Sequence, residues 1–210
     1  MIKHYTLLFT LLLLTNFIHS QEIGEYEILI VQGNTATHEF VVEEFEALGH
    51  TATPIPHASI TADFDFSPYD VAFISWDTPM TFLGYPDLIA ANEACEIGIV
   101  SMSHEDGMDS LFIGSGASWT DAELGIINNT HWITEPWGLG ILPLDFSYKV
   151  KLTNIPDGVT TLGVSAMDTI LVVHDTYKRA SGIYYGHTSG MPWSADGGNL
   201  INRIICWAAS

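Results

Sequence analysis

The stretch ILIVQGNTATHEFVVEEFEALGHTATPI, residues 28–55, decides the fold class. An apolar run over Glu27–Val31 predicts a buried strand that ends at Gln32–Asn34. Apolar side chains then recur at helical spacing over residues 38–48, after the capping residue Thr37, and a second strand is expected over 51–55. Strands that are apolar on both faces and joined by a helix are typical of a parallel sheet with right-handed crossovers.

The same alternation continues through the first half of the chain. Strands are predicted over 69–75 and 97–101, with a helix over 86–95 between them. The second half changes to short strand-like runs separated by Gly, Pro and Asp, before a last helix over 199–208; these runs cover residues 131–134, 148–152, 160–164, 169–173 and 182–185. We therefore predict an α/β fold: a flavodoxin-like, three-layer, doubly wound and mostly parallel sheet with an antiparallel extension in the second half.

Residues 1–20 have the three parts of a cleavable secretory signal. Lys3 and His4 form a basic start, residues 7–14 form an almost unbroken apolar core, and Ser20 precedes the expected cut at Ser20/Gln21. The apolar core is too short for a bilayer span, which needs ~20 residues. Export to the periplasm or the medium is expected, with residues 21–210 forming one domain and no stable membrane anchor.

The chain is strongly acidic, with a net charge of −19 that becomes −20 once Lys3 leaves with the signal. Nucleic acid is excluded as a partner, because binding it requires clustered Lys and Arg. Solubility explains the acidity most simply, and cation binding is the alternative. Cys95 and Cys206 lie among apolar neighbours in predicted helices and are interpreted as small buried thiols, although export would permit a disulfide.

The loops that follow parallel strands are where open α/β sheets bind ligands. By that rule the predicted ligand-binding residues are Gln32, Asn34, His38, Trp76, Asp77, His104 and His174. Catalysis has weaker candidates, which are Ser103, His104, Glu105 and His187. In a hydrolase, His174 or His187 would have to act as the base for Ser101 or Ser103.

A metal site is the second interpretation of these loop residues. The cluster His104-Glu105-Asp106 could join His38, His174 and His187 around a metal ion, but the spacing matches no known ligand motif. Ordinary loop polarity is favoured, so no metal site and no cofactor are expected.

Tryptophans are numerous in the predicted loops. Their faces suit stacking on sugar rings, or they fill the core beneath long loops, and the sequence favours neither; the five are Trp76, Trp119, Trp132, Trp137 and Trp193. Trp207, in the last helix, is assigned to the core.

The order of these segments resembles the class I glutamine amidotransferase-like superfamily, especially its secreted, trehalose-utilisation-like relatives. The similar segments are residues 28–55, the strand YDVAFIS, Asn129–Thr134, Gly182–Gly186 and the helix NLINRIICWA. Active amidotransferases of this superfamily place a cysteine in an elbow after the central strand. Here that position reads Val100-Ser101-Met102-Ser103-His104, so glutamine hydrolysis is not expected.

These observations predict an exported, non-catalytic α/β domain that binds a small molecule, a glycan or a protein, with carbohydrate as the favoured ligand class. A secreted hydrolase acting on a sugar or amide through a His/carboxylate site is the first alternative. An accessory module that contacts another exported protein is the second.

Overall fold

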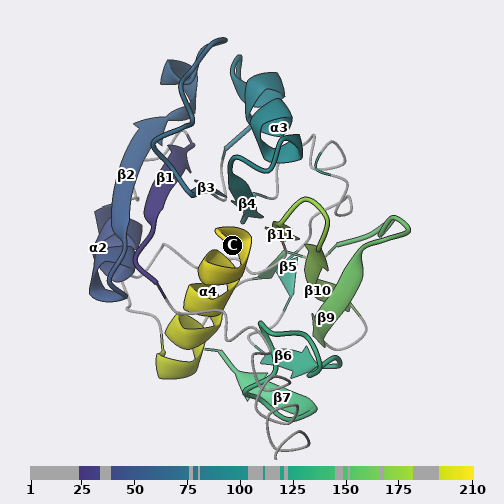
Figure 1. The fold of residues 1–210 in the computed structure, drawn as a ribbon. Coiled ribbons are helices and arrows are strands. Elements are labelled where there is room, and N and C mark those ends of the chain that lie inside the picture. Colours follow the sequence, from purple (N-terminus) through teal and green to yellow (C-terminus); the bar gives the residue numbers. More distant parts are fainter. Residues whose placement is uncertain are drawn as a thin grey trace, which may run out of the picture.

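The computed structural model describes residues 24–33, 39–75, 78–79, 81–103, 111, 119–120, 123–144, 149–150, 152–165, 168–181 and 194–210. Its centre is a nine-stranded sheet with the order β2-β1-β3-β4-β11-β10-β9-β6-β7 (Figure 1). The strands are β1 (Glu27–Gln32), β2 (Thr51–Pro56), β3 (Val71–Ile74), β4 (Gly98–Ser101), β6 (Glu123–Ile126), β7 (Gly140–Pro143), β9 (Thr160–Ser165), β10 (Asp168–His174) and β11 (Arg179–Ser181). A separate pair joins β5 (Trp119–Thr120) to β8 (Lys149–Val150).

The sheet changes character at β11. The strands β2, β1, β3, β4 and β11 pair in parallel, whereas β11, β10, β9, β6 and β7 pair antiparallel. The predicted α/β class, with a parallel first half and an antiparallel extension, is confirmed. β11 belongs to both halves and therefore determines how they meet.

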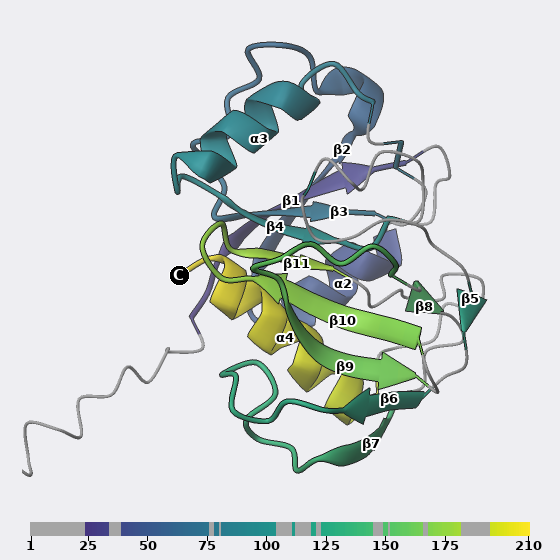
Figure 2. The same cartoon turned by 90° about the vertical axis from the view of Figure 1, so that its right-hand side faces the viewer.

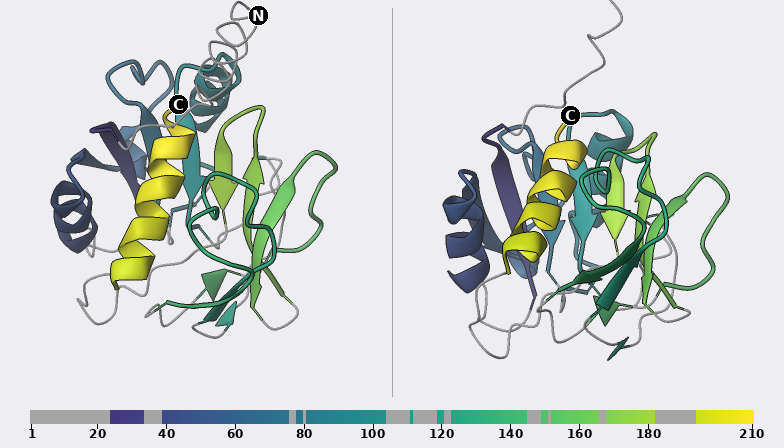
Figure 3. Two further views of the ribbon diagram at one scale, coloured as in Figure 1. Left: turned by 60° about the horizontal axis from the view of Figure 1, so that its bottom comes forward. Right: turned by 90° about the horizontal axis from the view of Figure 1, so that it is seen from below.

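The helices cover the sheet on both faces. Side chains of α2 (Glu39–Ala47) and α4 (Ala195–Ala208) pack with Ile28 and Ile30 of β1, while α3 (Tyr85–Glu93) packs on the side of Leu29 and Val31. Figure 2 shows α3 and α4 on opposite sides of the strands, and Figure 3 shows α2 and α4 on the same side. The four apolar side chains of β1, residues 28–31, are fully buried because helices pack on both faces of the sheet. This burial explains why the sequence is apolar at every one of these positions.

Several predicted elements differ from the structure. Residues 131–134 form turns rather than a strand, and β6 and β7, which contain Gly and Pro, were not predicted. The strand expected at 182–185 lies outside the described residues, and β11 ends directly before it. The last helix begins at Ala195 instead of Asn199, since the side chain of its cap Ser194 accepts a 3.1 Å hydrogen bond from the Gly197 N–H.

Within the described part of the chain, no helix combines the length and the apolar character that a bilayer span requires.

Gly98 lets the end of α4 approach the start of β4. A Cβ atom added at residue 98 would lie 2.1 Å from the Ala208 carbonyl oxygen, whereas one added at Gly138 would meet nothing within 4 Å. We expect Gly98→Ala to lower the free energy of unfolding by about 1–3 kcal/mol, because backbone must move to make room. Gly138→Ala is the matched control and should change it by less than about 0.5 kcal/mol. Equal urea midpoints for both variants would contradict the close approach.

Candidate functional site

The five parallel strands end at one edge of the sheet, which we call the carboxyl edge. Val31 of β1 pairs with Ile74 of β3, Ile74 pairs with Ser101 of β4, and Ser101 pairs with Ser181 of β11. Ligands of open α/β sheets bind outside this edge. The described residues there form the floor of the candidate site.

Buried hydroxyl groups line this floor. Five Ser and Thr side chains at or just beyond the strand ends are at most 4% exposed: Ser75, Thr78, Ser101, Ser103 and Ser181. Ser103 Oγ donates to the Thr78 carbonyl over 2.9 Å, and Thr78 Oγ1 donates to the Val31 carbonyl over 2.8 Å. The Ser103 N–H donates to Ser101 Oγ over 3.3 Å. This chain of hydrogen bonds fixes the ends of β1, β3 and β4 relative to one another.

Ser181 differs from the other hydroxyl groups. Its Oγ is buried, and no hydrogen-bond partner for it occurs among the described residues. Ser181 is in parallel register with Ser101, so the two side chains lie on the same face of the sheet. A buried unpaired hydroxyl costs about 1–3 kcal/mol, so a polar group placed beside Ser181 would recover part of that cost.

The structure places three of the residues that the sequence predicted for the site. Gln32 lies at the end of β1, where its carbonyl accepts a 3.1 Å hydrogen bond from His57 Nδ1. Ser103 is buried in the hydroxyl cluster, and His174 ends β10. The remaining predicted site residues lie outside the described residues: Asn34, His38, Trp76, Asp77, His104, Glu105 and His187.

His174 lies at the opposite edge of the sheet from Ser103. Because β10 runs antiparallel to β11, His174 pairs with Arg179 at the beginning of β11, which in turn pairs with Ile99. Two strand spacings, ~10 Å, separate β10 from β4. The expectation that His174 could act as a base for Ser101 or Ser103, or share a metal with loop residues after β4, is therefore wrong. His174 lies at this edge because β10 runs antiparallel to the parallel strands, and the direction of β10 could not be inferred from the sequence.

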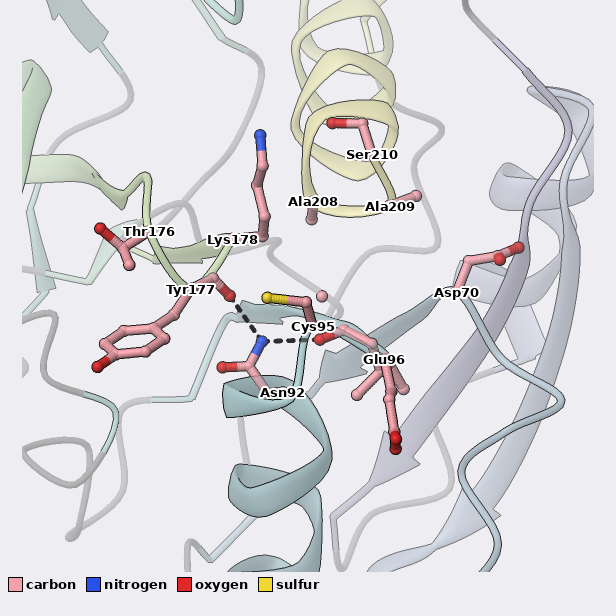
Figure 4. A pocket seen from close by; sticks show the side chains of 12 residues that line it. Asp70, Asn92, Cys95, Glu96, Thr176, Tyr177, Lys178, Ala208, Ala209 and Ser210 are labelled. Atoms are coloured by element: carbon pink, nitrogen blue, oxygen red, sulfur yellow. Dashed lines mark hydrogen bonds between the residues drawn. The ribbon is translucent and has the colours of Figure 1, made fainter.

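A pocket of about 180 Å³ opens at this opposite edge (Figure 4). Cys95, Asn92 and Lys178 are among the side chains around it. Cys95 follows α3, is exposed and has a φ of 60°, so its interpretation as a buried helical thiol is wrong. Cys206 is buried in α4 as expected, and burial raises its pKa. The two cysteines are not joined in a disulfide.

The tryptophans that the structure describes pack against the core. Trp132 and Trp137 lie against the cluster formed with α4, and Trp207 is buried within it. The Arg203 guanidinium covers the ring of Trp132 at 3.9 Å from its centroid, and Trp137 Nε1 donates to Asp196 over 3.5 Å. For Trp132 and Trp137 the core interpretation is therefore supported over sugar stacking. Trp76 and Trp193, and the side chain of Trp119, lie outside the described residues.

Comparison with solved structures identifies proteins of the same fold. A ThuA-like protein from Parabacteroides merdae superposes with a TM-score of 0.65 at 12% identity, over 89% of this chain and 91% of that one. A protein from Thermoplasma acidophilum, described as a GMP synthase subunit, gives 0.57 at 16% identity, over 87% and 94%. Agd3, described as a carbohydrate deacetylase, gives 0.50 at 14% identity, over 77% of this chain and 30% of that one.

No protein-family model and no curated protein sequence matches the chain. At these identities the structural likeness establishes the fold, and the resemblance to class I amidotransferase-like and ThuA-like proteins is confirmed at that level. Neither cysteine lies in the segment directly after β4, where the resemblance would place a nucleophile. Cys95 precedes that strand, and Cys206 lies in α4, more than a hundred residues further along the chain.

Ser75, Thr78 and Ser181 were not among the site residues predicted from the sequence. Ser75 comes directly after an apolar run, and that position is a signal that could have identified it. Ser181 gave no such signal, because β11 has the sequence Arg-Ala-Ser and begins with a charged residue.

Ser181→Ala and Ser103→Ala should affect stability in different ways. Ser181→Ala removes an unpaired buried hydroxyl, so we expect an unchanged free energy of unfolding or an increase of up to about 1 kcal/mol. Ser103→Ala removes a donor to the Thr78 carbonyl and should lower it by about 1–3 kcal/mol. Urea denaturation of both variants measures the difference. If Ser181→Ala destabilised the protein as much as Ser103→Ala, the Ser181 hydroxyl would have to be paired.

Proposed function

We propose that the protein is an exported binding domain that takes a neutral carbohydrate at the carboxyl edge of its sheet, without covalent catalysis. The buried Ser181 hydroxyl beside Ser101, which has no hydrogen-bond partner among the described residues, is the observation that carries the proposal. Hydroxyl groups both donate and accept, as the hydroxyls of a sugar do, so a floor of Ser and Thr suits a polyol. Export is supported by the signal-like residues 1–20.

The absence of catalysis is supported by the direction of a hydrogen bond. A serine nucleophile needs its O–H directed at a base, but Ser103 Oγ donates to a backbone carbonyl. His174, one of the two bases considered for it, lies at the other edge of the sheet. Residues 102–118, which follow β4, contain no cysteine, so the chain lacks a thiol at the position where the resemblance to amidotransferases would place the nucleophile.

A neutral ligand is favoured by the charges of the segments that follow the strands. Residues 33–38, 75–84, 102–118 and 182–193 contain no Lys or Arg, but they contain Asp77, Glu105, Asp106 and Asp109. An anionic sugar would be repelled by these carboxylates and would find no cation there.

A hydrolase remains the second candidate function. It is favoured by one comparison, because Agd3, which shares the fold over about a third of its own length, is described as a carbohydrate deacetylase. The two candidates differ in whether a sugar is changed or only bound.

We expect neutral oligosaccharides to raise the melting temperature of residues 21–210, and uronic-acid oligosaccharides to leave it unchanged. A ligand at 100 times its Kd adds ~2.7 kcal/mol, which a thermal-shift screen detects. Ser181→Ala should weaken the effect at least tenfold in apparent Kd while the protein stays folded. The matched control Thr160→Ala changes a part-exposed residue of β9 and should keep the shift.

Three results would contradict the proposal. The absence of any shift across a panel of neutral glycans would exclude carbohydrate binding. An equal shift with uronic-acid sugars would exclude the charge argument. Release of acetate or of a reducing end, lost in Ser103→Ala, would replace the binding domain by the hydrolase.

A further inference from the structure

The two outer strands of the sheet, β2 and β7, differ in their capacity to pair with a further strand. β2 forms one edge, and its Pro54 and Pro56 pair with Ile30 and Gln32 of β1. Proline has no N–H and is tolerated in an edge strand where that position faces outward. The β2 edge therefore lacks outward donors at these two positions, a device by which natural sheets avoid pairing with other chains.

β7 is the other outer strand of the sheet, and it has few of the features that keep an outer strand from pairing with another chain. Residues 136–144, PWGLGILPL, carry no charge, although edge strands are usually guarded by charged side chains. Its single proline, Pro143, lies at the last position of the strand. Among the described residues, no strand pairs with the free side of β7.

An exposed apolar patch adjoins this edge. Ile141 and Leu139 are each 66% exposed, and Ile127, at the end of β6, is 51% exposed. Leu142, the next residue after Ile141, points the other way into the core. Ile141 pairs with Gly125, which has no side chain to cover it. We call Ile127, Leu139 and Ile141 the β7 patch.

A second copy of this chain fits the β7 patch poorly. Three aliphatic side chains can bury a few hundred Å², on the order of an ordinary monomer's largest patch. A standard interface buries ~800 Å² on each partner. Each copy also carries a net charge of −19, so two copies repel one another.

We propose that β7 is a docking edge for an extended segment of another protein, which adds to the sheet as a tenth strand. Backbone hydrogen bonds to the open side of β7 supply affinity, and apolar side chains at alternate positions cover the β7 patch. Basic residues flanking that segment complement the acidic chain. The proposal is independent of the ligand at the carboxyl edge.

The test uses an eight-residue peptide that alternates threonine with valine and has lysine at each end. We expect it to bind residues 21–210 at concentrations below about 1 mM and to slow amide exchange in β7 but not in β2. Ile141→Lys should raise its Kd at least tenfold. Leu83→Lys, which places the same charge at a 73% exposed residue before α3, should leave the Kd unchanged.

A second peptide distinguishes strand addition from side-chain contact alone. The same sequence with N-methyl groups on every internal residue keeps its side chains but loses its backbone donors along both sides of the strand, and it should not bind. Retained binding would overturn strand addition, as would protection at β2 or no binding by the first peptide. A wild-type dimer that dissociates in Ile141→Lys would make a second copy the occupant and would overturn the proposal as well.

Discussion

The buried guanidinium of Arg179 fixes β11, the strand at which the two halves of the sheet meet, against α3. Arg179 begins β11, the strand that is parallel to β4 and antiparallel to β10, and its side chain is fully buried. Its Nε donates to Asn92 Oδ1 over 2.6 Å, and its Nη1 donates to the Leu111 carbonyl over 2.9 Å. Asn92 in turn donates to the carbonyls of Ile97 and Tyr177, each over 2.7 Å. A buried cation without such partners would be prohibitively costly, so α3, β4 and the turn before β11 are fixed as one unit.

The position of β11 determines which residues lie at the carboxyl ends and at the amino ends of the parallel strands. In the observed register Ser181 lies beside Ser101 at the carboxyl edge, whereas the β10–β11 turn brings Tyr177 and Lys178 to the opposite edge, next to Cys95. The hydroxyl cluster and the thiol are thus separated by the length of the strands. At the carboxyl edge, the described side chains of Ser103 and Thr78 donate hydrogen bonds to backbone carbonyls, and that of Ser101 accepts one from a backbone N–H.

The first half of the fold was predictable because its strands are buried on both faces. Runs such as Ile28–Val31 are apolar at every position, and that pattern needs no knowledge of the rest of the chain. β7 and β11 were not predictable in the same way. β7 contains Gly and Pro and exists because β6 pairs with it, while Arg179 looks like a surface residue until Asn92, 87 positions earlier, is placed against it. Gln32 and Ser103 could be predicted as site residues because each lies at the end of such an apolar run. His174 was assigned to the wrong edge and Ser181 was missed, because their positions depend on how β10 and β11 pair with strands that are distant in the sequence.

The two outer strands of the sheet differ: β2 carries prolines that disfavour pairing with a further strand, whereas β7 has only Pro143, at its last position. At β2 the prolines lie in the strand that flanks the parallel, deeply buried half, where a misplaced strand would extend the sheet next to its core. At β7 the open edge ends the antiparallel extension, farthest from the hydroxyl cluster in strand order. A partner added there would lengthen the sheet by one strand and leave the registers of β4 and β11 unchanged. The arrangement therefore allows the carboxyl edge and the β7 edge to be occupied at the same time, because neither occupant needs the other's strands.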